Sequence, residues 1–84
     1  MHETREAAIE QWLRAWFAER APEIELKRED NYFEKGAIDS FGVIELIEEM
    51  ESHFSVRFTE QDFQDRCFVT LAGLVEILRE KGKD

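Results

Sequence analysis

Apolar side chains in three stretches of this chain recur at the spacing of one face of an α-helix. In the first stretch they fall at i, i+3, i+4, i+7 and i+8, and in the second at i, i+3, i+4, i+7 and i+11. Each stretch therefore predicts a helix with one buried stripe, and three such helices can pack around a common core. The stripes consist of Ile9, Trp12, Leu13, Trp16 and Phe17, then Val43, Leu46, Ile47, Met50 and Phe54, then Leu71, Leu74, Val75 and Leu78.

Residues at the ends of these stretches predict where the helices begin and end. The first helix is expected to begin near Thr4, a typical N-cap residue, and to end before Pro22. The second is predicted to run from about Ser40 to Phe54. The last is predicted to begin after Thr70 as its N-cap and to end near Gly82 as its C′ residue.

Residues 21–39 show neither helical nor strand periodicity and predict a long loop between the first two helices. A short helix is expected at Thr59–Arg66, because Thr59 and Asp62 have the spacing of a capping box. The sequence thus predicts a single all-α domain over residues 1–84, a small bundle of three main helices plus one short helix. The loop side chains expected to pack on its core are Leu26, Tyr32, Phe33 and Ile38.

The chain carries 20 acidic and 11 basic side chains, which gives a net charge of −9. This balance argues against nucleic-acid binding, which needs clustered Lys and Arg, and against binding to anionic membranes. A partner protein with a basic surface is favoured instead, and we expect it to dock on the middle of the chain. Residues 21–62 hold twelve of the acidic side chains and only four basic ones, Lys27, Arg28, Lys35 and Arg57.

Other sequence features favour a soluble, cytoplasmic monomer without a metal site. Cys67 is the only cysteine and has no metal-ligand spacing around it, so we interpret it as a small apolar filler. The N-terminus lacks the apolar segment of a signal peptide, and no apolar run is long enough for stable membrane insertion. Trp12, Trp16 and Phe17 could mark a membrane-surface helix, but the polar face of that helix has too little basic charge, which favours core packing.

The junction between the loop and the second helix reads Gly36-Ala37-Ile38-Asp39-Ser40-Phe41-Gly42. An oxygen at the start of a helix faces free backbone N–H groups and the positive end of the helix dipole. A phosphate esterified to Ser40 would be stabilised there. The simpler interpretation is that Asp39 or Ser40 is only an N-cap.

This segment, continued by Val43-Ile44-Glu45-Leu46-Ile47, resembles the phosphopantetheine attachment motif of acyl and peptidyl carrier proteins. In that family a Gly-x-x-Asp-Ser-Leu/Met/Phe segment precedes an acidic helix, and its serine is the modified residue. The resemblance extends over nearly the whole chain, from the long first helix and the long loop to the apolar last helix. Phe33 stands where the family has an aromatic anchor before the motif.

The resemblance implies an acyl-carrier-like fold and a free-standing carrier protein without catalytic residues. Ser40 would accept 4′-phosphopantetheine from coenzyme A through a separate, magnesium-using phosphopantetheinyl transferase, and Asp39 would help that transferase recognise the site. The arm would carry an acyl or aminoacyl group as a thioester from an activating ligase to downstream transfer enzymes. Tethering would keep this cargo at high effective concentration near each enzyme.

The resemblance also implies a docking face on the second helix, formed by Phe41, Ile44, Glu45 and Glu48. These residues share one side of the helix, largely turned from the core stripe. Phe41 replaces the commoner leucine of the family, and Glu48 lies where many members have methionine or another apolar residue.

Two segments resemble D-alanyl carrier proteins and favour an aminoacyl or D-alanyl-like cargo. The first is Asp39-Ser40-Phe41-Gly42, which is similar to their Asp-Ser-Met-Gly. The second lies between Thr59 and Thr70 and is similar to the third-helix region of D-alanyl carrier proteins, where an acidic pair and an aromatic residue precede a threonine. Fatty-acid, polyketide and nonribosomal peptide pathways remain open. The residues that match this second segment are Thr59, Glu60, Phe63, Asp65, Arg66, Phe68 and Thr70.

Catalysis by a serine hydrolase is disfavoured by the lack of a suitable base. The only histidines are His2, near the N-terminus, and His53, which we interpret as a solvated residue at the end of the second helix. There is also no Gly-x-Ser-x-Gly segment. The alternative that remains is an acidic helical protein-interaction module with no prosthetic group.

A calcium-binding loop is disfavoured by the residues at its ligand positions. A twelve-residue loop that begins at Asn31 would place Gly36 at the sixth position, as such loops require. However, Phe33, Lys35 and Gly42 would then occupy positions that need oxygen ligands. The sequence therefore predicts no calcium site.

Overall fold

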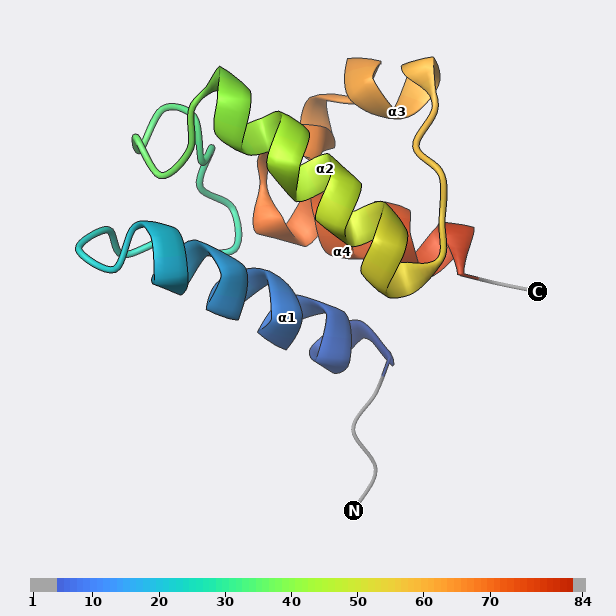
Figure 1. The fold of residues 1–84 in the computed structure, drawn as a ribbon, viewed down its shortest axis with the longest axis horizontal. Coiled ribbons are helices and arrows are strands. Elements are labelled where there is room, and N and C mark those ends of the chain that lie inside the picture. Colours follow the sequence, from blue (N-terminus) through green and yellow to red (C-terminus); the bar gives the residue numbers. More distant parts are fainter. Residues whose placement is uncertain (1–4, 83–84) are drawn as a thin grey trace.

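The computed structural model describes residues 5–82, which form a helical bundle around one core (Figure 1). Figure 1 shows the first two helices running in opposite directions, joined at one end by the loop of residues 21–39. Three longer helices and one short helix confirm the predicted all-α architecture. The elements are α1 (Arg5–Arg20), α2 (Ser40–Phe54), α3 (Glu60–Gln64), the 3₁₀ turn η1 (Arg66–Val69) and α4 (Leu71–Lys81).

Most of the predicted helix boundaries are confirmed. The second helix has the predicted bounds, Ser40–Phe54. Thr59 is the N-cap of α3 and forms the predicted capping box with Asp62. Thr70 is the N-cap of α4, as expected. The short helix ends before the predicted Arg66, because Asp65 caps α3 and the 3₁₀ turn η1 begins at the next residue. This turn was not anticipated, because its four residues carry no periodic signal of their own.

One predicted helix end differs from expectation in its detail, and another lies outside the described residues. Thr4, the expected N-cap of the first helix, falls in that undescribed part of the chain. Gly82 follows α4 as predicted, but its φ of −83° is not the left-handed conformation of a C′ glycine. That conformation occurs instead at Ser55, where φ is 57° and the backbone N–H donates to the carbonyl of Glu51.

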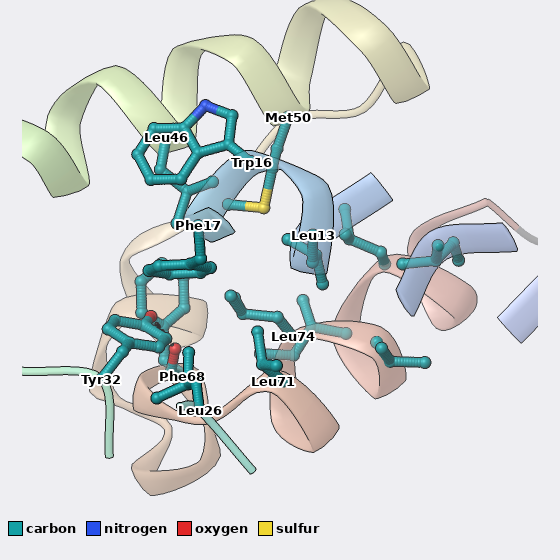
Figure 2. Packing of buried hydrophobic residues seen from close by; sticks show 14 of the residues in the cluster. Leu13, Trp16, Phe17, Leu26, Tyr32, Leu46, Met50, Phe68, Leu71 and Leu74 are labelled. Carbon is teal, nitrogen blue, oxygen red and sulfur yellow. Dashed lines mark hydrogen bonds between the residues drawn. The ribbon is translucent and has the colours of Figure 1, made fainter. Parts of the chain in front are cut away.

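The core lies where α1, α2 and α4 face one another. Every residue of the three predicted stripes is buried or packs against this cluster, so the stripes are confirmed. Figure 2 shows Leu46 and Met50 reaching from α2 toward the side chains of α1. Trp16 and Phe17 are buried, which supports the interpretation of the aromatic first helix as a core element.

The loop of residues 21–39 is attached to the C-terminal half of the chain through Tyr32. Its side chain is fully buried, and its hydroxyl donates a hydrogen bond to the carbonyl of Phe68 (Figure 2). Its backbone N–H donates to the carbonyl of Val69, and the neighbouring Asn31 forms a β-bridge with Thr70. Burial raises the pKa of Tyr32 far above its ordinary value, so the phenol remains a proton donor at any physiological pH.

Three of the four loop side chains expected to pack on the core do so, and one does not. Leu26 and Tyr32 are buried, and Ile38 packs against the cluster. Phe33 is 39% exposed, although its ring centroid lies 5.3 Å from that of Tyr32. The expectation for Phe33 is therefore wrong, because Tyr32 already fills the space between the loop and the core.

The interpretation of Cys67 as an apolar filler is also wrong, because its side chain is exposed. The backbone of Cys67 packs against α4. A Cβ atom placed on Gly73 would lie 1.7 Å from the carbonyl oxygen of Cys67. Only a glycine therefore allows η1 to approach α4 this closely.

Gly73→Ala is expected to lower the free energy of unfolding by about 1–3 kcal/mol, because the new methyl group would collide with backbone that cannot move freely. Urea denaturation monitored by circular dichroism measures this change. In an unconstrained helix, alanine is about 1 kcal/mol more favourable than glycine. A variant as stable as the parent, or more stable, would contradict the close approach described above.

Asp62 ties α3 to both its own cap and the end of α4. Its carboxylate accepts the backbone N–H of Thr59 at 2.7 Å and forms an ion pair with Lys81. Partial burial acts to raise the pKa of Asp62, but the hydrogen bonds from Lys81 and Thr59 outweigh it and hold the pKa below its ordinary value. The folded state therefore favours the charged form of Asp62.

Because the pKa of Asp62 is lowered on folding, its contribution to stability is present above the unfolded pKa of about 3.9 and is lost as the pH falls through the folded value. We expect Asp62→Asn to lower the free energy of unfolding at pH 7 by about 0.5–1 kcal/mol. The difference from the parent should narrow at pH 3. Urea denaturation at the two pH values tests this, and an equal difference at both would show that Asp62 does not titrate differently on folding.

Candidate functional site

Asp39, rather than Ser40, caps the second helix. Asp39 has an extended backbone (φ −116°, ψ −175°), and its Oδ1 accepts the backbone N–H of Gly42 at 2.7 Å. Its carbonyl accepts the backbone N–H of Val43 at 2.9 Å. Ser40 is therefore the first helical residue, and its side chain is not needed to satisfy the helix end.

The hydroxyl of Ser40 has no partner among the described residues. Its side chain is exposed and forms no hydrogen bond with the rest of the described chain. It stands in the first turn of α2, where the N–H groups of Ser40 and Phe41 have no acceptor within the helix. A phosphodiester on this oxygen would lie beside those donors and the positive end of the helix dipole, so the position fits a phosphate-linked group.

The loop before Ser40 holds this junction in place. Gly36 adopts φ +77°, a conformation that favours glycine, and its N–H donates to the carbonyl of Phe33. Ala37 is buried, and its N–H donates to the carbonyl of Tyr32 at 2.9 Å. The buried Tyr32 thus fixes the chain only a few residues before the exposed serine.

Gly42 allows the residues before the helix to fold back over its first turn. A Cβ atom at this position would lie 2.8 Å from Cγ1 of Ile38 and 3.2 Å from Oδ1 of Asp39. The glycine that follows the Asp39-Ser40-Phe41 segment therefore protects the cap geometry. Its role is steric, since only φ values of the left-handed region would require glycine for conformational reasons.

The four residues predicted to form a docking face lie together on the exposed side of α2. Phe41 is 85% exposed and Ile44 is 55% exposed, which is unusual for large apolar side chains. Glu45 and Glu48 are exposed beside them. We use the term docking face for these four residues from here on.

One feature that sequence reasoning missed is an ionic contact between α1 and α2. The guanidinium of Arg20 lies 3.9 Å from the ring centroid of Trp16, and it pairs with Glu49 at 3.1 Å and with Glu45 at 3.5 Å. The indole N–H of Trp16 donates to the other oxygen of Glu49 at 3.1 Å. A basic residue at the end of one helix, followed by an acidic helix, is the only signal in the sequence that could have indicated this contact.

The other candidate groups do not form a site. His53 is exposed near the end of α2, as predicted, and its ring stacks on Trp12 with centroids 5.0 Å apart. Within residues 5–82 no three His, Cys, Asp or Glu side chains are grouped to hold a metal ion. A search of the same residues finds no helix with the length and apolarity needed to cross a membrane.

Comparison with known proteins identifies the family. A model of the phosphopantetheine attachment site matches residues 11–78, a region that runs from α1 into α4 and includes the Asp39-Ser40 junction. Searches of curated proteins and of solved structures returned no match. Because the family match covers most of the chain, this protein belongs to the family of phosphopantetheine attachment domains, the carrier domains to which 4′-phosphopantetheine is covalently bound.

Proposed function

We propose that Ser40 is the residue that carries 4′-phosphopantetheine, and that the protein presents an acyl or aminoacyl thioester on this arm to partner enzymes. The observation that carries the proposal is the exposed, unbonded hydroxyl of Ser40 at the start of α2, inside the segment that matches the family model. When bound, the arm supplies a terminal thiol on which cargo is held as a thioester.

The residues around Ser40 support attachment in two ways. Asp39 satisfies the helix end with its own carboxylate, so the serine oxygen can be esterified without loss of the cap. The free N–H groups of the first turn stabilise the negative phosphodiester that results. The side chain of Asp39 is also exposed, which suits the proposed recognition of this residue by a phosphopantetheinyl transferase.

The docking face on α2 suits partners that bind briefly. Phe41 and Ile44 offer apolar contact, and the neighbouring carboxylates attract basic side chains. Charge complementarity of this kind raises association rates and selects partners more than it raises affinity. The proposed partners are the transferase, an activating ligase and the enzymes that use the cargo. The carrier is proposed to act as a monomer, and its arm would hold the cargo at high effective concentration near each docked enzyme.

An aminoacyl group is the cargo we favour among the possible thioesters. The support comes from Asp39-Ser40-Phe41-Gly42 and from the region between Thr59 and Thr70, both of which resemble D-alanyl carrier proteins. In the structure these regions form the start of α2 and the segment of α3 and η1. Incubation of the arm-bearing protein with candidate ligases would distinguish aminoacyl from fatty acyl loading.

Incubation with coenzyme A, magnesium and a broad-specificity phosphopantetheinyl transferase is expected to add one arm to Ser40. Intact-protein mass spectrometry measures the gain, and peptide mapping locates it. Ser40→Ala should abolish the gain and change stability by less than about 0.5 kcal/mol, since Asp39 keeps the cap. Ser52→Ala, which removes another exposed serine of α2, is the matched control and should be modified like the parent.

The result that would contradict the proposal is a folded parent protein that no transferase modifies. In that case the chain would function as an acidic interaction module without a prosthetic group. Modification that persists in Ser40→Ala would instead move the attachment site to another residue.

Reversing Glu45 and Glu48 to lysine is expected to slow modification of Ser40 by about tenfold at low ionic strength, because the docking face would then repel a basic partner. The measurement is kcat/KM of the transferase, and the difference should shrink as salt screens the charges. The matched control is the double variant Glu25→Lys/Glu29→Lys, which makes the same change in net charge at two exposed positions of the loop between α1 and α2. Equal rates for both double variants would place the docking face elsewhere.

A further inference from the structure

The four glutamates of α2 are not equally available to a partner. Glu51 accepts the backbone N–H of Phe58 at 2.9 Å, so it secures the segment that follows the helix. Glu49 accepts hydrogen bonds on both oxygens, from Trp16 and from Arg20. These two carboxylates are therefore engaged within the molecule.

Glu45 and Glu48 both lie on the docking face, but only one of them is paired. Glu45 lies 3.5 Å from Nε of Arg20, and the same guanidinium is within 4 Å of Glu19 and Glu49. Glu48 has no ion pair or hydrogen bond from its side chain to the remainder of the described residues. A cation that approaches Glu45 therefore also approaches Arg20, whereas Glu48 has no basic side chain of the described residues within ion-pair distance.

Arg20 is held firmly enough to make this difference persistent. Its guanidinium lies over the ring of Trp16, a residue that is 5% exposed, and pairs with Glu49, which is itself fixed by the indole of Trp16. The side chain of Arg20 is 32% exposed, so part of its charge is shielded from water by these contacts. A planar guanidinium stacked on an aromatic ring and paired with carboxylates loses these interactions if a partner displaces it.

We propose that Arg20 masks Glu45 and thereby makes Glu48 the main acidic contact for a lysine or arginine of a partner enzyme, beside the exposed side chains of Phe41 and Ile44. This inference rests on the proposed carrier function and specifies which charge of its docking face a partner reads. A complementary partner surface would have a small apolar patch that covers Phe41 and Ile44. Beside the patch, a basic residue would reach Glu48 and not the pair of Arg20 and Glu45.

Two single substitutions on the docking face test the masking directly. Glu48→Gln and Glu45→Gln remove the same charge from the same helix. We expect Glu48→Gln to lower kcat/KM of a phosphopantetheinyl transferase by about two- to fivefold at low salt, and Glu45→Gln to lower it by less than about twofold. An effect of Glu45→Gln as large as that of Glu48→Gln would overturn the proposal.

Removal of Arg20 should leave Glu45 without its ion pair. Arg20→Gln is expected to raise kcat/KM by about two- to fivefold at low salt and to steepen its salt dependence. In the Arg20→Gln background, Glu45→Gln should then slow modification about as much as Glu48→Gln does. Non-additivity of this kind is what a double-mutant cycle measures for residues in contact.

The matched control is Arg28→Gln, which removes the same charge from an ion pair with a carboxylate that lies on α1 instead of α2. Arg28 pairs with Glu10 at 2.9 Å, away from the docking face. Glu10 keeps its second ion pair, with Arg14 at 3.0 Å. Equal rates for Arg20→Gln and Arg28→Gln would show that only net charge matters and would overturn the masking. Arg20→Lys provides a second variant, which keeps the positive charge. In this background, Glu45→Gln should still lower kcat/KM by less than about twofold.

These outcomes separate the inference from the proposed function. If no variant and no parent protein gains an arm, while circular dichroism shows that all are folded, the carrier function itself fails and the inference fails with it. If all are modified but the two glutamate substitutions have equal effects, the carrier function stands and the masking by Arg20 is wrong.

Discussion

The burial of Tyr32 determines where the long loop can lie, and through the loop it determines where the second helix begins. Its hydroxyl donates to the carbonyl of Phe68, its backbone N–H donates to Val69, and its own carbonyl accepts the N–H of Ala37. The phenol stays protonated because burial raises its pKa, so this anchor does not depend on pH. Without it, the loop would keep the buried side chains of Leu26 and Ala37 but would lose its hydrogen bonds to Phe68 and Val69.

At the start of α2, two neighbouring residues have separate roles. One caps the helix, and the other keeps an unpaired hydroxyl. Asp39 accepts the otherwise unpaired N–H of Gly42 and so caps the helix, while Ser40 remains exposed. Had the serine been the cap, esterification would have required the helix to lose a hydrogen bond. A capped helix with a free serine in its first turn can instead accept a bulky group at little cost to the fold.

The structural features that could be predicted from the sequence are those that depend on the spacing of neighbouring residues or on the chemistry of a single residue. Helical stripes, the capping box at Thr59 and the loop–helix junction follow from neighbouring residues, and so they could be found without coordinates. Contacts between distant segments could not be found in this way. The approach of Cys67 to Gly73 and the packing of Arg20 on Trp16 depend on how separate helices and turns meet. The left-handed conformation after α2 was also not predicted, because it occurs at Ser55 and not at a glycine.

The net charge of −9 does not by itself show which acidic side chains a partner can contact. That depends on which carboxylates are already paired within the molecule. On α2, Glu49 and Glu51 hold neighbouring segments in place, and Glu45 faces a guanidinium that belongs to the same molecule. Charges that are paired internally add little to the field that a partner experiences nearby, because the opposite charge lies within a few ångströms. The electrostatic signal of this helix is then concentrated at Glu48, next to the apolar side chains that a partner would cover.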